Sequence, residues 1–167
     1  YVLEAKSTTP SFYPLVSIII PSYNEEKVIQ AAIESVLKIN YPNVEIIVVD
    51  DGSLDLTSEI AKEFEEKGCL RVIYKENAGK ASALNRGISE SLGEYVLCMD
   101  ADSRLNESVL INAMNLFEKY PSLAAVAGRV EVGNNYNLLL QFQQLEYIQN
   151  KDLGYQQEQI LIIDDAY

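Results

Sequence analysis

Short apolar runs alternate along the chain with longer segments in which apolar residues recur every three or four positions. The runs lie at residues 16–20, 44–49, 70–74, 95–99, 124–130 and 160–163. Near-continuous, β-branched runs of this length are typical of strands that are covered on both faces. We therefore predict buried parallel strands over the first five runs, and a last strand at 160–163 that no further element follows.

The segments between the runs have helical spacing. They cover about residues 28–37, 57–66, 80–91 and 109–117. We expect Asp55 to cap the second helix, Gly68 to end it, and Pro121 to limit the fourth. Strands that alternate with helices predict βαβ units, and so an α/β fold with a Rossmann-like, mostly parallel sheet and helices on both faces.

Composition and charge narrow the possible functions. The 167 residues fit one α/β domain, and 48% hydrophobic with 23% charged residues is typical of a globular chain. The net charge of -12 opposes binding to nucleic acid. Histidine is absent from the sequence, which removes histidine triads and imidazole zinc sites. The available chemistry is therefore that of carboxylates, hydroxyls, lysine and arginine.

Polar residues follow the first predicted strand, at the edge where ligands of parallel sheets bind. Pro21 is expected to end sheet pairing there, and Tyr23 offers a flat face to a nucleotide base. Asn24 and Glu25 fit equally well as a helix cap and a first-turn acid.

Carboxylates also follow the second and fourth predicted strands. Asp50 and Asp51 are adjacent, although a helix cap needs only one acid, so the pair indicates a metal or a hydrogen-bond donor such as a ribose or an imide N–H. Asp100 and Asp102 are separated by one residue and can share a hard cation.

A helix start with a lysine lies between these acidic pairs. Lys80 follows Asn77-Ala78-Gly79 and opens the third predicted helix, where a diphosphate would fit. The glycine spacing of a P-loop is absent, and the alternative is a solvated lysine.

Together these motifs resemble the family 2 glycosyltransferases with the GT-A fold, and most of all the processive synthases of hyaluronan, chitin, cellulose and poly-N-acetylglucosamine type. The matching strings, in order over about residues 14–132, are VSIIIPSYNEE (16–26), IIVVDDGSLD (46–55), NAGKASALNRGI (77–88) and YVLCMDADS (95–103). The resemblance implies inverting, metal-dependent transfer from a UDP-sugar donor to a growing polysaccharide or other glycan acceptor.

The resemblance also implies a role for each candidate residue. Pro21, Tyr23 and Glu25 would edge the uridine pocket, and Asp51, with Asp50, would face the uracil and ribose. Lys80 would meet the diphosphate, and Asp100 would lie near the ribose or donor sugar. Asp102, with Asp100 as second choice, would ligate Mg²⁺ or Mn²⁺.

The C-terminal part departs from the family pattern. The family has an acidic motif with the catalytic base and then a motif that ends in Arg-Trp, but this sequence has no tryptophan. Asp165 or Asp164 is the candidate remnant of the acidic motif. We expect an N-terminal extension (1–13), a GT-A nucleotide-sugar-binding region (14–132), and an amphipathic helix (134–159) with an acceptor-side remnant (133–167).

The chain is expected to be an excised, soluble piece of a longer protein. By resemblance, that parent protein is associated with the cytoplasmic side of the cell membrane. Two alternatives stay open: a non-catalytic nucleotide-binding module, and a signalling receiver domain. A receiver would carry a lysine at the end of its last strand, whereas the run at 124–130 ends in Gly128-Arg129.

Overall fold

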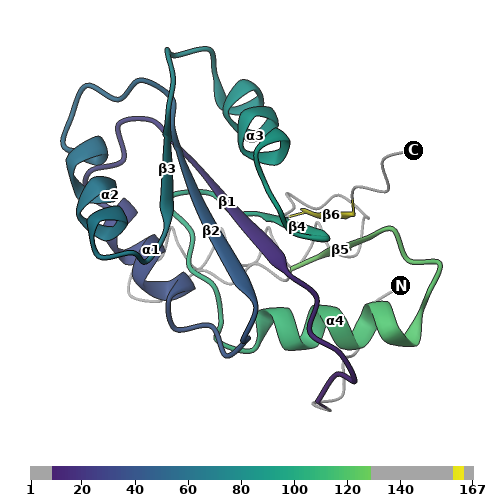
Figure 1. Cartoon of the computed structure of the whole chain (residues 1–167). Coiled ribbons are helices and arrows are strands. Elements are labelled where there is room, and N and C mark those ends of the chain that lie inside the picture. Colours follow the sequence, from purple (N-terminus) through teal and green to yellow (C-terminus); the bar gives the residue numbers. More distant parts are fainter. Residues whose placement is uncertain (1–8, 129–159, 164–167) are drawn as a thin grey trace, which may run out of the picture.

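The computed structural model describes residues 9–128 and 160–163, which form one sheet with helices around it (Figure 1). The elements, in chain order, are β1 (Val16–Ser22), α1 (Ile29–Val36), β2 (Val44–Asp50), α2 (Thr57–Glu66), β3 (Arg71–Tyr74), α3 (Lys80–Ser89), β4 (Tyr95–Cys98), α4 (Val109–Lys119), β5 (Ala125–Ala127) and β6 (Ile160–Ile163). The predicted alternation of strands and helices is confirmed, and the ends of the elements differ from the prediction by a few residues.

The sheet has the strand order β3-β2-β1-β4-β6-β5. β1 pairs in parallel with β2 and β4, and β2 pairs in parallel with β3. The predicted strand at 160–163 is present as β6, which is antiparallel to both β4 and β5. The sheet is therefore mostly parallel, as predicted, with one antiparallel strand inserted near its edge. The predicted burial of the run at 124–130 was wrong: β5 is the edge strand of the sheet, and Ala125 and Ala127 are exposed.

Side chains of the strands alternate between two apolar layers. Val16, Ile18 and Ile20 of β1 pack in a cluster with residues of α1, α2 and α4. Ile19 faces the other way and packs with Ala83 of α3 and its neighbours. Helices thus cover both faces, which Figure 1 shows as α1 and α2 on one side of the sheet and α3 on the other. The two-residue period of a strand explains why nearly every residue of these runs is apolar.

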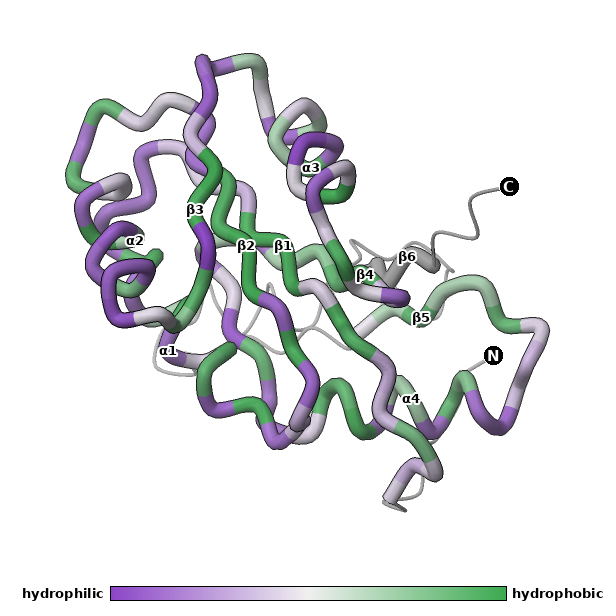
Figure 2. The backbone as a smooth tube through the Cα atoms, viewed as in Figure 1, coloured by the Kyte–Doolittle hydropathy of each residue, from purple (hydrophilic) through white to green (hydrophobic). Residues whose placement is uncertain are grey.

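Hydropathy follows the same arrangement (Figure 2). Hydrophobic residues are concentrated along β1, β2 and β3, and hydrophilic residues lie in the loops beyond them. In the part of the chain that the structure describes, no helix is both long and apolar enough to cross a membrane. The predicted amphipathic helix at 134–159 and the acids Asp164 and Asp165 lie outside the described residues.

Pro21 does not end the sheet pairing, and this prediction was wrong. β1 continues to Ser22, and Pro21 lies opposite Val49 of β2. The carbonyl of Ile19 accepts a hydrogen bond from the segment that continues β4, so two residues later the proline nitrogen also faces that side. Because pairing with β4 ends at Ile19, no partner there needs the N–H that proline lacks.

The C-terminus of α2 is as predicted, but the N-terminus is not, because the residue at the N-cap is Leu56, which makes no side-chain cap hydrogen bond. Asp55, the predicted cap, lies one residue earlier. Asp55 accepts hydrogen bonds from the backbone N–H of Thr57, at 3.0 Å, and from its hydroxyl. At the C-terminus, Gly68 N–H donates to the Glu65 carbonyl at 2.8 Å and the next N–H donates to the Phe64 carbonyl at 3.1 Å. This pair of bonds is a Schellman motif, which satisfies carbonyls that the helix leaves free.

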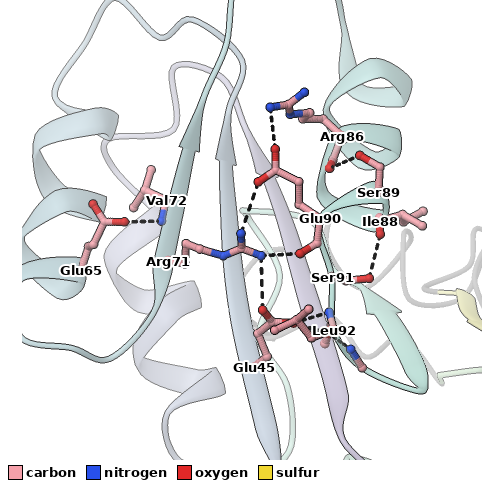
Figure 3. Close-up of polar contacts among 12 residues, drawn as sticks. Glu45, Glu65, Arg71, Val72, Arg86, Ile88, Ser89, Glu90, Ser91 and Leu92 are labelled. Atoms are coloured by element: carbon pink, nitrogen blue, oxygen red, sulfur yellow. Dashed lines mark hydrogen bonds and ion pairs between the residues drawn. The ribbon is translucent and has the colours of Figure 1, made fainter.

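An ion-pair network ties α3 to the amino ends of the strands (Figure 3). Arg71 of β3 pairs with Glu90 at 3.2 Å and with Glu45 of β2 at 3.3 Å, and it also donates to the Glu90 carbonyl at 2.5 Å. Arg86 of α3 pairs with Glu90 at 2.5 Å. The network lies at the amino ends of β2 and β3, away from the carboxyl ends of the strands, so we assign it to stability.

Candidate nucleotide site

The strand order places a topological switch point at the carboxyl ends of β1 and β4. From β1 the chain proceeds to β2 and β3 on one side, whereas β4 lies on the other side of β1. Ligands of open α/β sheets bind in the crevice at such a point. Glu25 follows β1, and Asp100 and Asp102 follow β4, so the structure brings these three predicted residues to the switch point.

The carboxylates at the switch point act on one another. The pKa of Glu25 is raised, first by burial and then by the negative charges of Asp102, Asp55 and Asp100. Asp100 pairs with Lys80 of α3 at 2.5 Å, and both side chains are at least half exposed. Asp102 is exposed. Glu25, Lys80, Asp100 and Asp102 therefore form one exposed-edge cluster, which we call the switch-point cluster.

The loops after β1 and β2 are joined by reciprocal hydrogen bonds. Asn24, whose φ is 55°, donates its N–H to the Ser53 hydroxyl at 3.0 Å, and its side-chain oxygen accepts from Leu54 N–H at 2.8 Å. Glu26 N–H donates to Asp55 at 3.1 Å. The alternative interpretation of Asn24 as a helix cap and Glu25 as a first-turn acid was wrong, because α1 begins only at Ile29 and has no acidic residue in its first turn. Asn24 instead bonds to the neighbouring loop.

Thr57 binds the backbone of Glu25 through its side-chain hydroxyl. Its hydroxyl donates to Asp55 at 2.5 Å and accepts the Glu25 N–H at 2.7 Å, and the residue is completely buried. Burial opposes the ionised form of Asp55, but the hydrogen bonds from Thr57 and Glu26 outweigh it and hold the pKa of Asp55 below its ordinary value. The backbone of Glu25 is thus fixed to the first turn of α2.

Asp50 is bonded within its own loop. One carboxylate oxygen accepts the Ser53 N–H at 3.0 Å, and the other accepts the Ser58 hydroxyl. The residue is 3% exposed. Both oxygens of this predicted ligand-facing acid therefore have partners in the protein.

Asp51 is as buried as Asp50, and its hydrogen-bond partners include a charged lysine. It accepts hydrogen bonds from the Lys75 ammonium and from the backbone N–H groups of Ala78, at 3.1 Å, and Gly79, at 2.7 Å. Burial alone would raise the pKa of Asp51, but these donors and the lysine charge lower it below its ordinary value. The carboxylate is therefore held ionised, and it fixes the loop that leads into α3.

Gly52 allows that loop to approach β2. Its φ is +75°, and a Cβ at this position would lie 2.9 Å from the backbone nitrogen of Asn77 and 3.3 Å from the carbonyl oxygen of Lys75. A side chain would collide with the backbone there, so the close packing of residues 75–79 against the end of β2 requires glycine.

The predicted uridine-edge residues differ in exposure. Tyr23 is 44% exposed, Glu25 is half-buried, and Pro21 is buried in the sheet. Sequence reasoning missed Lys75 and the polar residues Ser53 and Thr57. The polar residues Ser53, Asp55 and Thr57 alternate along the chain up to the first residue of α2, and this alternation was the signal that could have indicated the loop contacts.

Metal ligands were sought at the same edge. Over the described ranges, no group of three or more histidine, cysteine, aspartate or glutamate side chains is arranged to hold a metal ion. Asp102 and Asp100 supply the hard oxygen donors that Mg²⁺ and Mn²⁺ prefer, and such ions commonly take one or two carboxylates together with substrate phosphates. The donor set fits a cation that a diphosphate helps to bind.

A hollow of about 660 Å³ lies elsewhere, between α1 and the loop at 104–108. Its lining includes Glu34, Lys38, Arg104 and Glu107, with opposite charges in equal number. None of the switch-point cluster lines it, so we do not assign it to the nucleotide site.

The sheet order and the position of the switch-point cluster define an α/β domain with a Rossmann-like, mostly parallel sheet. Residues 17–166 match the family described as Glycosyl transferase family 2. The chain belongs to this family, as the resemblance predicted, and the signalling-receiver alternative is excluded.

Within this family, the chain is similar to curated polysaccharide synthases. The chain is 38% identical over 133 residues to a poly-beta-1,6-N-acetyl-D-glucosamine synthase of Staphylococcus epidermidis, with 79% of this chain and 32% of the relative covered. A synthase of the same name from Staphylococcus aureus (strain COL) is 34% identical over the same coverage. The chain thus spans about a third of the length of these relatives.

Solved structures confirm the GT-A-like fold. S. aureus TarS 1-349 in complex with UDP-GlcNAc is 29% identical, with a TM-score of 0.66 and coverage of 74% of this chain and 36% of that one. The mannosyltransferase PcManGT from Pyrobaculum calidifontis, in complex with GDP-Man and Mn2+, is 30% identical, with a TM-score of 0.66 and coverage of 80% and 41%. These neighbours contain two different nucleotides.

Proposed function

We propose that the chain forms the donor-nucleotide part of an inverting glycosyltransferase that transfers a sugar from a UDP-sugar to a growing polysaccharide or other glycan acceptor. The observation that carries the proposal is the switch-point cluster, in which Lys80 at the start of α3 pairs with Asp100 beside Glu25 and Asp102. The similarity to poly-N-acetylglucosamine synthases and to TarS supports a sugar polymer or glycan as the acceptor.

The nucleoside would bind at the β1–β2 side of the crevice. A carboxylate has about four acceptor positions, two on each oxygen. Oδ1 of Asp51 already accepts from Lys75 and Ala78, and Oδ2 accepts from Gly79, so one acceptor position remains on Oδ2. It would accept the uracil imide N–H or a ribose hydroxyl. The exposed ring of Tyr23 would stack on the base, while Pro21 and Asp50 would shape the pocket from behind.

The diphosphate would bind at the α3 side. Lys80 is the first residue of α3, where the helix dipole and the free N–H groups favour an anion. Its ammonium would leave Asp100 and donate to the diphosphate. Asp102, with Asp100 as second choice, would hold Mg²⁺ or Mn²⁺. When bound, that cation supplies positive charge that stabilises the leaving diphosphate.

Transfer would be a single displacement at the anomeric carbon. The bond to the acceptor oxygen forms as the bond to the diphosphate oxygen breaks, and the acceptor proton passes to a base. Asp165, or Asp164 beside it, is our candidate for that base. We place the whole protein at the cytoplasmic side of the cell membrane by similarity to the polysaccharide synthases.

Calorimetry tests the nucleotide assignment. The 167-residue chain is titrated with UDP, GDP and ADP, each with and without Mn²⁺. We expect UDP to bind most tightly and its affinity to rise with Mn²⁺. Equal affinity for the three nucleotides would contradict the uridine assignment, and tighter binding of GDP would replace it with the guanosine nucleotide found in the PcManGT structure.

A further inference from the structure

We infer that Lys75 is a positioning residue of the nucleotide site, which acts through Asp51 to hold that carboxylate and the 75–79 loop ready for the nucleoside. The inference rests on the proposed function, because it assumes that a uridine nucleotide contacts Asp51. Lys75 contacts Asp51 and is not proposed to touch the ligand.

The contacts of Lys75 are those of a buried anchor. Its side chain is 17% exposed and that of Asp51 is 4% exposed. The ammonium donates to Asp51 and, at 2.6 Å, to the carbonyl of Glu76. Among the described residues, Asp51 has its ion pair with Lys75 alone. Removing the lysine would therefore leave a buried carboxylate without its counter-charge.

The position of the 75–79 loop depends on the same carboxylate. Ala78 and Gly79 donate their N–H groups to Asp51, and α3 begins at the next residue, Lys80. A neutral or rotated Asp51 would release these N–H groups and with them the entry into α3. Lys75 thus fixes both the free acceptor of Asp51 and the place where the helix begins.

The two lysines that flank this loop have different surroundings. Lys80 is 62% exposed and pairs with a half-exposed partner, Asp100, so it can exchange that partner for a ligand. Lys75 is mostly buried and pairs with a buried partner, so it cannot leave without cost. We therefore expect Lys80 to contribute to diphosphate affinity and Lys75 to contribute to discrimination among nucleosides.

The test compares nucleoside selectivity in variants of the whole 167-residue chain. Lys75→Met removes the charge and keeps most of the stem, and Lys75→Arg keeps the charge. Lys62→Met is the matched control, because Lys62 is an exposed lysine on α2 paired with Glu66. Affinities for UDP and ADP are measured by calorimetry with and without Mn²⁺, and folding is followed by circular dichroism.

We expect Lys75→Met to lose about tenfold in UDP affinity, as for loss of a charged hydrogen-bond partner. ADP affinity should fall by a smaller factor, because adenine lacks the imide N–H that Asp51 would accept from uracil, whereas both nucleotides share the ribose and the diphosphate that binds at the start of α3. The ratio of UDP affinities with and without Mn²⁺ should stay as in the parent chain. Lys75→Arg should recover most of the UDP preference, and Lys62→Met should change none of these values. A general loss of structure would instead weaken UDP and ADP by the same factor.

The outcomes separate this inference from the proposed function. If the parent chain shows no preference for UDP, the proposed function fails and the inference fails with it. If the parent chain prefers UDP and a folded Lys75→Met variant keeps that preference, only the inference is overturned. Should Lys75→Met fail to fold, Lys75→Gln replaces it. Its amide can still donate to Asp51 without charge, so we expect a smaller loss of UDP affinity that still exceeds the loss of ADP affinity, and an unchanged preference for UDP would overturn the inference.

Discussion

Replacing Thr57 with valine would remove the hydroxyl that binds the loop containing Glu25. That hydroxyl donates to Asp55 and accepts the Glu25 N–H at 2.7 Å, and Thr57 is completely buried. Valine has nearly the same shape, so the substitution leaves no cavity, and its effect comes from the lost hydrogen bonds. The change therefore isolates the contact between the β1 loop and α2.

The magnitude follows from what each partner retains. Asp55 keeps hydrogen bonds from the N–H groups of Thr57, at 3.0 Å, and Glu26, at 3.1 Å, so its loss is partial. The Glu25 N–H loses this acceptor, and an unsatisfied buried donor costs about 1–3 kcal/mol. We expect a loss of about 2 kcal/mol, which for a chain of this size lowers Tm by about 4–8 °C.

Thermal and urea unfolding, followed by circular dichroism, measure this loss. Thr57→Ser keeps the hydroxyl and should retain the loop contact. Thr9→Val makes the same substitution at an exposed residue and should change stability by less than about 0.5 kcal/mol. If Thr57→Val unfolds with the same free energy as Thr9→Val, the hydroxyl does not support Glu25 and the reasoning is refuted.

Three further predictions concern the same edge of the sheet. Asp102→Asn should reduce the gain in UDP affinity that Mn²⁺ gives and leave the metal-free affinity unchanged; calorimetry that finds the full gain would remove Asp102 as a ligand. The pKa of Asp51 is lowered in the folded chain, so its contribution to stability is present above about pH 4 and is lost as the pH falls through the pKa of the folded state. The free energy of unfolding, measured in urea, should therefore fall less on acidification in Asp51→Asn than in the parent chain. Gly52→Ala should destabilise the chain by about 1–3 kcal/mol, because the added Cβ meets the Asn77 nitrogen in a positive-φ position; an unchanged urea midpoint would contradict the close approach.

Much of the fold was predictable because the central strands β1 and β2 are largely buried on both faces. In β2 every residue from 46 to 49 is apolar, and local spacing is enough to recognise such a run. The place of β6 was not predictable, because its antiparallel pairing with β4 and β5 joins residues far apart in the chain. Pro21 was misread for a related reason: whether a strand tolerates proline depends on which neighbour its nitrogen faces.

The site was predictable as a location but not as a set of contacts. Acids at the ends of β1, β2 and β4 must meet at one edge of a parallel sheet, and the structure brings them there. The ion pair between Lys75 and Asp51 could not be predicted from the sequence, because Lys75 is a loop residue and the local sequence pattern does not distinguish it from a solvated lysine. Side-chain pairing between loops depends on their three-dimensional course, which carries no periodic signal.

The acidic residues at this edge of the sheet form two groups, which differ in whether protein groups donate hydrogen bonds to their carboxylates. Asp50, Asp51 and Asp55 accept hydrogen bonds from the protein, and the pKa values of Asp51 and Asp55 are lowered as a result. Glu25 instead faces Asp100 and Asp102, and burial together with their charges raises its pKa. Carboxylates held by protein donors need no cation, whereas carboxylates that repel one another are stabilised by one. The first group therefore builds the walls of the crevice, and the second is the part of it that a cation and a diphosphate would complete.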